Sequence, residues 1–257
     1  MRRTCEHAVR IGLPAVIFTE HLDVSTAWVV EEGDIGHHAQ KYVDATGHVN
    51  LPEFDTGGYL AAIERCRAEF PALRILTGVE FGQPHVPHPF AERLLASGAI
   101  DRVNGSLHML PVDDGVRTEP TTLYRSRPAD EVVWRYLDEL LVMIERSDAF
   151  AVLCHIDYAM RSWPMDEIGP FDPERFESGF RTAMRALADS GRALEMNTRR
   201  LWPWIPQWWA EEGGRAITFG SDTHSPHQLA AHFPEAMAMV ASYGFRPGVE
   251  PEDFWTR

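Results

Sequence analysis

Short apolar runs alternate with amphipathic segments along most of this chain. Each run has the length and composition of a buried strand, and most are followed by apolar positions at helical spacing. The expected strands cover residues 15–18, 74–79, 100–107, 150–154, 192–196 and 216–219. This alternation is typical of α/β folds, in which helices cover a parallel sheet or barrel.

Helix stop signals and apolar spacing predict where the helices lie between the strands. The expected helices are one that ends at Gly12 and others over about 55–70, 90–95, 128–147, 172–190 and 226–243, with a helical turn before Gly213. Residues 24–54 and 111–127 show no sustained period, and we expect irregular structure there. Since no linker or repeat divides the chain, we expect one domain over residues 1–257.

The composition fits a soluble globular protein and narrows its partners. The 257 residues are 44% hydrophobic and 24% charged, and the formal net charge is −14. Nucleic-acid surfaces need a basic footprint, so this balance argues against a nucleic-acid partner. A small phosphorylated substrate remains compatible, because bound metal ions can reverse the sign of the charge locally.

Several further features favour a cytoplasmic protein away from membranes. No apolar run reaches the ~20 residues of a membrane span, and the start lacks the apolar core of a signal peptide. The three cysteines, Cys5, Cys66 and Cys154, show no CxxC spacing. We expect reduced and mostly structural thiols. The sequence does not indicate an oligomeric state.

The polar residues at the strand ends form the main candidate site. The last expected strand is followed by Asp222 and His224, which alone would read equally well as a turn with a solvated histidine. The same pattern recurs at the other strands, with His21, Glu80, His108, His155 and Asn197. Carboxyl ends of parallel strands meet at one edge, and convergent buried carboxylates and imidazoles are costly unless a cation compensates them. The pattern therefore predicts a metal site.

The residue types limit both the metal and the reaction. Imidazole mixed with carboxylate suits Zn, Fe or Mn, and Cys154 is the one thiolate candidate near these ends. Two or three adjacent cations are suited to hydrolysis of a phosphate ester. An amidohydrolase-type metal hydrolase also uses His and Asp at barrel strand ends, so that alternative stays open at this point.

The strand-end motifs resemble those of a known family in their order along the chain. They are TEHLD (19–23), GVE (78–80), GSLH (105–108), HID (155–157), EMNT (195–198) and GSDTH (220–224). In this order they resemble the PHP (polymerase and histidinol phosphatase) superfamily, and within it the histidinol-phosphatase branch. The resemblance covers most of the chain.

The resemblance implies a distorted (β/α)7 barrel with a trinuclear metal centre, hence two or three divalent ions. It implies that Glu80 bridges two metals, that His108 and His155 complete the second, that Asp222 belongs to the first, and that His21 and His224 bind the third. Glu80 and Asp222 are the implied catalytic residues, and Arg161 and Arg199 the implied phosphate contacts. The implied activity is a metal-dependent phosphomonoesterase that hydrolyses L-histidinol phosphate in histidine biosynthesis.

The chain departs from the family at its first strand. The family carries a His-x-His pair there, whereas this chain begins inside the helix that should follow, and His7 has no partner two residues away. The mapping leaves the first metal with Glu80 and Asp222 and the third with His21 and His224. We expect that the start was assigned too far downstream, because every other motif is intact. An inactive metal-binding remnant is the alternative.

Overall fold

A curled, seven-stranded sheet forms the centre of the computed structural model, which describes residues 1–23, 27–36, 39–112 and 115–257. The strand order follows the chain: β1 (Ala15–Asp23), β2 (Arg74–Gly82), β3 (Arg102–Ser106), β6 (Val152–Leu153), β7 (Ala193–Asn197), β8 (Ala216–Gly220) and β9 (Trp255–Thr256). All neighbours pair in parallel except β8 and β9. Within the described ranges β1 pairs with β2 alone, so the sheet is open along β1.

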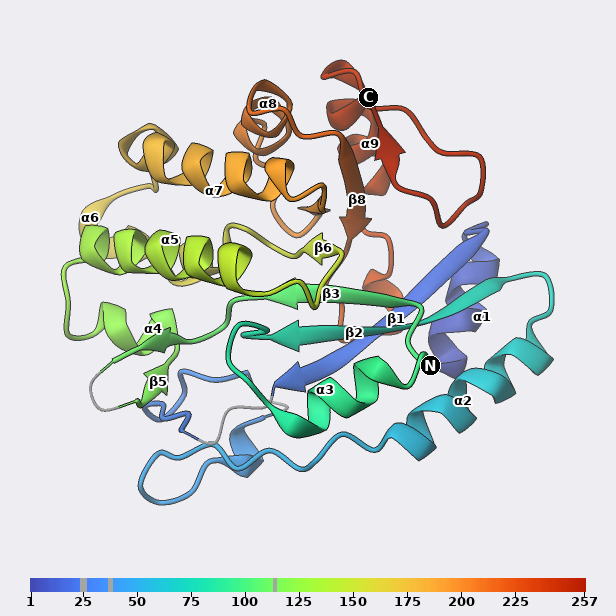
Figure 1. Cartoon of the computed structure of the whole chain (residues 1–257), viewed down its shortest axis with the longest axis horizontal. Coiled ribbons are helices and arrows are strands. Elements are labelled where there is room, and N and C mark those ends of the chain that lie inside the picture. Colours follow the sequence, from blue (N-terminus) through green and yellow to red (C-terminus); the bar gives the residue numbers. More distant parts are fainter. Residues whose placement is uncertain (24–26, 37–38, 113–114) are drawn as a thin grey trace.

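Helices connect the parallel strands and pack outside the sheet (Figure 1). They are α1 (Arg2–Arg10), α2 (Thr56–Glu69), α3 (Pro89–Ala96), α4 (Pro120–Tyr124), α5 (Ala129–Arg146), α6 (Met165–Ile168), α7 (Glu177–Asp189), α8 (Trp204–Glu211) and α9 (Phe233–Ser242). Short 3-10 turns are η1 (Gln40–Tyr42), η2 (Tyr158–Ser162), η3 (Pro173–Phe176) and η4 (Pro226–Gln228). A two-stranded ribbon joins β4 (Leu110–Pro111) to β5 (Arg117–Thr118). The predicted α/β class is therefore confirmed.

Two large apolar clusters hold the helices to the sheet. The first surrounds α5, α7 and α8 and includes the buried Trp204, Trp208 and Trp209. The second joins α1 and α2 to β1 and β2, with Cys5, Ile63 and Cys66 among its buried members. Most of the tryptophan-rich segment before β8 therefore forms core, because its rings pack between α7 and the sheet.

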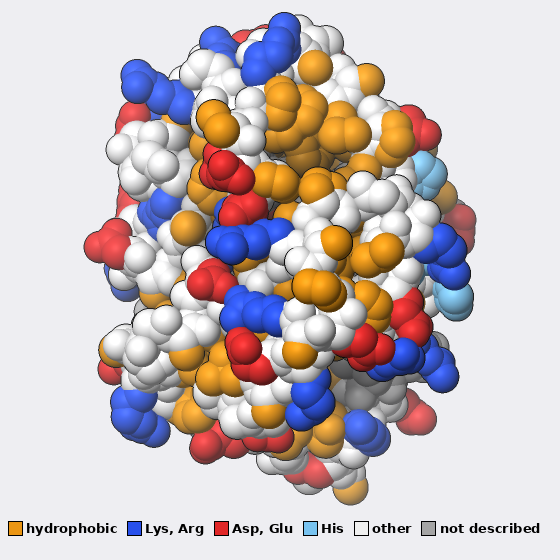
Figure 2. Space-filling view, turned by 90° about the vertical axis from the view of Figure 1, so that its right-hand side faces the viewer, with side chains coloured by type: hydrophobic (Ala, Val, Ile, Leu, Met, Phe, Trp, Pro, Cys, Tyr) orange, Lys and Arg blue, Asp and Glu red, His pale blue; other side chains and the backbone are white. Residues whose placement is uncertain are grey.

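The surface on the right-hand side of Figure 1 carries no single kind of charge. Figure 2 shows basic and acidic side chains intermixed there, with hydrophobic side chains between them. Arg2 of α1 and Glu69 of α2 form an exposed ion pair, and Arg74 of β2 pairs with the partly buried Glu252. In the described part of the chain, no helix is both long and apolar enough to cross a bilayer.

The predicted loop over 111–127 is wrong in part. Strand β5 and helix α4 lie there, and the side chains of Thr118 and Leu123 are buried. The local sequence is polar and lacks a period, so it gives no helical signal; packing of α4 against α5 and η2 stabilises the segment instead. Residues 113–114 of this stretch lie outside the described part.

The predicted single helix over 226–243 is also wrong. The segment begins with η4, and α9 starts only at Phe233, because Ala230 and His232 have φ angles of 56° and 61°. An α-helix requires φ near −63°, and Pro234 lacks the N–H that a continuous helix would use there. Likewise, the predicted helix over 172–190 starts with η3 before α7.

The long excursion over 24–54 has little regular structure, as expected, apart from η1. Its described residues are nevertheless packed: Trp28, Val30 and Val49 are buried in a small cluster with Met109. Residues 24–26 and 37–38 of the excursion lie outside the described part.

Tyr59 provides a test of how α2 is fixed to the sheet. Its hydroxyl lies 2.8 Å from the carbonyl oxygen of Phe18 and 2.8 Å from the amide nitrogen of Gly78, so it bridges β1 and β2. We expect Tyr59→Phe to lower the free energy of unfolding by about 1–3 kcal/mol, because buried backbone groups lose their partner. Denaturant unfolding measures this, and Tyr243→Phe is the matched control. Equal losses in both variants would contradict the bridge.

Candidate metal centre

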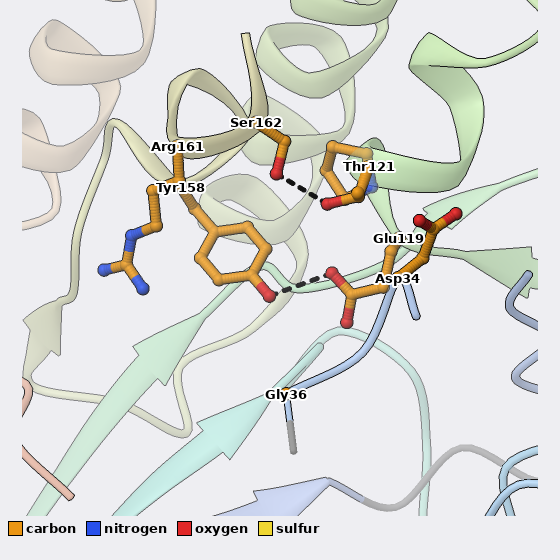
Figure 3. Close-up of a pocket in the computed structure, with 8 residues that line it drawn as sticks. Asp34, Gly36, Glu119, Thr121, Tyr158, Arg161 and Ser162 are labelled. Carbon is orange, nitrogen blue, oxygen red and sulfur yellow. Dashed lines mark hydrogen bonds between the residues drawn. The ribbon is translucent and has the colours of Figure 1, made fainter. Parts of the chain in front are cut away.

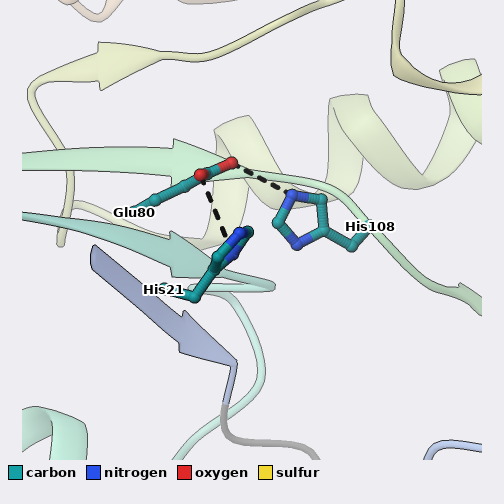
Figure 4. A group of neighbouring side chains, drawn as sticks. All are labelled: His21, Glu80 and His108. Carbon is teal, nitrogen blue, oxygen red and sulfur yellow. Dashed lines mark hydrogen bonds and ion pairs between the residues drawn. The ribbon is translucent and has the colours of Figure 1, made fainter. Parts of the chain in front are cut away.

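The predicted metal ligands meet at the carboxyl edge of the parallel strands. His21 and Glu80 are direct partners in the register between β1 and β2. Figure 4 shows the side chains of His21, Glu80 and His108 turned toward one another. One possible ligand atom from each of these three residues lies within 4.8 Å of the other two. The other predicted ligands, His155, Asp222 and His224, follow β6 and β8 at the same edge.

Glu80 is the centre of this group. Its side chain is nearly buried, and Oε1 lies 3.0 Å from Nε2 of His108 and 2.6 Å from Nε2 of His155. Burial alone would raise the pKa of Glu80, but the hydrogen bonds from His108 and His155 lower it well below its usual range. Glu80 is therefore a fixed negative charge with imidazole nitrogens on one of its oxygens.

Asp23 orients two of the imidazoles, a role that the sequence did not reveal. Its buried carboxylate lies 2.9 Å from Nδ1 of His108 and 3.1 Å from Nδ1 of His21. A carboxylate on one ring nitrogen fixes the tautomer and aims the other nitrogen, the arrangement found behind metal-binding histidines. The available signal was spacing: Asp23 follows His21 by two residues on β1, so both side chains lie on one face.

The donor set fits a divalent cation. Nε2 of His21 and Nε2 of His224 are 3.2 Å apart. Two nitrogens that share one tetrahedral zinc ion at about 2.0–2.1 Å lie roughly 3.3 Å apart. Burial alone would lower the pKa of His21, but the hydrogen bond to Asp23 and the charge of Glu80 outweigh it and raise the pKa to about 9. The negative charge at this edge thus favours a bound cation. When no metal ion is bound, a proton on His21 supplies the positive charge.

Asp222 lies with the two predicted arginines. A terminal guanidinium nitrogen of Arg161 is 2.7 Å from Oδ2 of Asp222, and one of Arg199 is 3.6 Å from the same atom. Arg161 is mostly buried, whereas the side chain of Arg199 is 55% exposed. Burial would raise the pKa of Asp222, but the charge of Arg161 lowers it. Asp222 also has a φ angle of 45°, a strained conformation of the kind that clusters at functional sites.

Cys154 is not placed as a thiolate ligand. Its thiol donates to the carboxylate of Glu195 over 3.3 Å, and burial raises its pKa well above the usual range. Asn197, the last residue of β7, also donates to Glu195, over 3.1 Å. A Cβ at Gly220 would come within 2.3 Å of this carboxylate, so the glycine of the last motif makes room for it. Cys154 and Asn197 therefore both bind Glu195 beside the cluster.

Several known proteins are similar to this chain over most of its length. The sequence model of the PHP domain matches residues 1–199. The chain belongs to the PHP family. It is 25% identical over 249 residues to a probable histidinol-phosphatase of Clostridium acetobutylicum, covering 90% of this chain and 96% of that protein. It is 26% identical over 253 residues to the histidinol-phosphatase of Lactococcus lactis, covering 95% of this chain and 85% of that protein.

A solved structure shares the fold over most of both chains. The crystal structure of the Lactococcus lactis histidinol phosphate phosphatase, complexed with zinc, L-histidinol and phosphate, has a TM-score of 0.72 at 22% identity. The match covers 95% of this PHP chain and 88% of that chain. The predicted PHP-type α/β fold is thereby confirmed.

Asp23 allows the orienting role to be tested. We expect Asp23→Asn to weaken zinc or manganese binding about 10- to 100-fold, because the amide no longer holds His108 and His21 as the carboxylate does. Competition with a chromophoric chelator measures the affinity. Asp138→Asn is the control, because Asp138 lies exposed on α5 and is the same residue type. Unchanged metal affinity in Asp23→Asn would refute the role.

Proposed function

We propose that this PHP protein is a metal-dependent phosphomonoesterase and that its substrate is L-histidinol phosphate. The observation that carries the proposal is the cluster around Glu80, in which imidazole nitrogens converge on a buried carboxylate beside the guanidinium of Arg161. A cation site next to a buried arginine suits a phosphate dianion. The similarity to histidinol-phosphatases over most of the chain supports the choice of substrate.

The ligand assignment is part of this proposal. Glu80 would bridge two of two or three divalent ions of Zn, Fe or Mn. His108 and His155 would complete one site, Asp222 would belong to a second, and His21 and His224 would hold a third. The imidazoles favour these metals over magnesium, which prefers oxygen ligands.

The side chains around the metal site would have separate roles in orienting the ligands and binding the phosphate. Bound divalent ions lower the pKa of water and neutralise phosphoryl oxygens. Asp23 keeps His108 and His21 aimed at the centre. Arg161 holds a phosphoryl oxygen and stabilises the charge that develops during hydrolysis, as fixed donors do in a water-poor site. Arg199, being more exposed, would contact the phosphate at the mouth of the site.

Activity and chelation test the function directly. We expect purified protein supplied with zinc, manganese or iron to release phosphate from L-histidinol phosphate. Chelation should abolish the release and added metal should restore it, because the cations supply the reactive water. A parallel panel of amides and lactones tests the amidohydrolase-type alternative. No phosphate release with any of the metals would contradict the proposal and favour an inactive metal-binding protein.

Arg161 tests the phosphate contact. We expect Arg161→Lys to lower kcat/KM about 10- to 100-fold, because lysine cannot reproduce the planar two-nitrogen contact of a guanidinium. Metal content is measured in parallel, since Arg161 also binds Asp222. Arg65→Lys, at an exposed position on α2, is the control. Equal kcat/KM in both variants at full metal content would exclude a phosphate role for Arg161.

A further inference from the structure

The position of the His108 imidazole depends on the backbone that carries it. Nδ1 of the ring lies 2.9 Å from Asp23, and Nε2 lies 3.0 Å from Glu80. The ring of Tyr158, which lines a small cavity, packs against His108 with the centroids 4.8 Å apart. Figure 3 shows the Tyr158 hydroxyl turned toward Glu119. These contacts hold the imidazole ring alone, so the backbone at residue 108 needs a support of its own.

That backbone lies just beyond the end of a strand ladder. The pairing of β2 with β3 ends at Gly82 and Ser106, and β3 itself ends at Ser106. The next residues are nevertheless buried, since His108 is 4% exposed and Met109 is 0% exposed. A buried backbone N–H that lacks an acceptor is strongly unfavourable. The segment that leaves β3 therefore needs acceptors from outside the ladder.

The side chain of Gln83 supplies these acceptors. Gln83 directly follows β2 and is 2% exposed. Its side-chain oxygen accepts a hydrogen bond from the backbone N–H of His108 over 2.6 Å and another from that of Met109 over 3.0 Å. The backbone N–H of Gln83 donates to the carbonyl oxygen of Ser106 over 2.8 Å. One side chain thus takes the place of a strand partner for two residues.

Gln83 adopts a strained backbone conformation at this point. Its φ angle is 52°, in the left-handed region that residues other than glycine rarely adopt. Such conformations persist only where the surrounding contacts hold them, and they cluster at functional sites. The N–H of Val86 donates to the carbonyl oxygen of Gln83 over 2.9 Å and closes a turn after β2. This turn places the Gln83 amide beside the segment that leaves β3.

The residue before Gln83 supports the same histidine. A Cβ on Gly82 would come within 1.9 Å of Oδ1 of Asp23 and 3.5 Å of Nδ1 of His108. The glycine therefore leaves room for the contact between Asp23 and the imidazole. The turn after β2 thus acts on His108 twice, since Gly82 admits the partner of the ring and Gln83 holds the backbone.

We propose that Gln83 is a positioning residue for the metal ligand assigned to His108, and that it acts through the backbone N–H groups of residues 108 and 109. This inference rests on the proposed metal-dependent function and deepens it. Asp23 would orient the imidazole, whereas Gln83 fixes the point from which the imidazole extends. Bonds between a metal ion and its ligands are defined to about 0.2 Å, so a small displacement of this backbone weakens them.

Amide hydrogen exchange, followed by NMR with a chelator present, tests the clamp independently of any metal ion. We expect the amide protons of His108 and Met109 to exchange at least about tenfold faster in Gln83→Met, because methionine has a similar size and no comparable acceptor. Gln83→Glu retains an oxygen acceptor on a side chain of the same length and should keep the slow exchange. The amides of β7 should be unchanged in both variants, which distinguishes a local effect from a loss of global stability.

Zinc affinity then tests the consequence for the ligand. We expect Gln83→Met to bind at least one zinc ion about tenfold or more weakly, measured by competition with a chromophoric chelator. In a His108→Ala background, the same substitution should change zinc affinity by less than about twofold, because Gln83 acts only through His108. Gln207→Met makes the same change at a partly exposed position on α8 and should alter neither exchange nor affinity.

Three results would overturn the proposal: fast exchange of both amides in the wild-type protein, unchanged exchange in Gln83→Met, or an equal loss of zinc affinity with and without His108. If circular dichroism shows that Gln83→Met does not fold, Gln83→Asn replaces it. Its amide is too short to reach both N–H groups, so the same losses are expected and their absence would count against the clamp.

Phosphate release by the wild-type protein is measured separately. Its absence would count against the proposed function, whereas the exchange rates and zinc affinities would still decide the role of Gln83. The two failures are therefore distinguishable.

Discussion

Negative charge buried at the carboxyl edge of the sheet is the constraint on which the rest of the site depends. Asp23, Glu80 and Glu195 are nearly inaccessible to water, and Asp222 is only slightly more exposed. A carboxylate in such a position is strongly destabilising unless it is paired, hydrogen-bonded or neutral. The arrangement of the neighbouring imidazoles, arginines and hydroxyls follows from meeting that condition.

The buried carboxylates of the site meet this condition in three different ways. Glu80 and Asp23 are bound by imidazoles, which can exchange a proton for a metal ion. Asp222 is paired with Arg161, whose charge is permanent. Burial raises the pKa of Glu195 and that of Glu119, so both are held closer to their neutral forms. Carboxylates bound by imidazoles, a carboxylate bound by an arginine and acids held near neutrality therefore lie at one edge of the sheet.

The parallel sheet makes this concentration of charge possible. Register between β1 and β2 places His21 against Glu80, and the helices outside the sheet bury the amino-terminal parts of the same strands. The hydrophobic clusters stabilise the scaffold, so the polar edge need not contribute to stability. Tyr59 shows the connection directly, because one buried hydroxyl fixes α2 to the two strands that carry His21 and Glu80.

The sequence by itself determined the strands, most of the helices and the residues at the strand ends. Apolar runs and the polar residues that close them are local features, so His21, Glu80 and His108 could be found from periodicity and motif order alone. Local pattern failed at α4 and before α9, where distant packing and positive φ angles override it.

Only the tertiary structure decided which polar groups touch. Asp23 reaches His108 across 85 residues of sequence, and Tyr158 reaches Glu119 across 39. Such contacts depend on strand order, register and side-chain direction, none of which leaves a periodic trace in the chain. The polar residues that meet at the strand ends could thus be predicted from the sequence. The carboxylate of Asp23, which contacts two of them, could not.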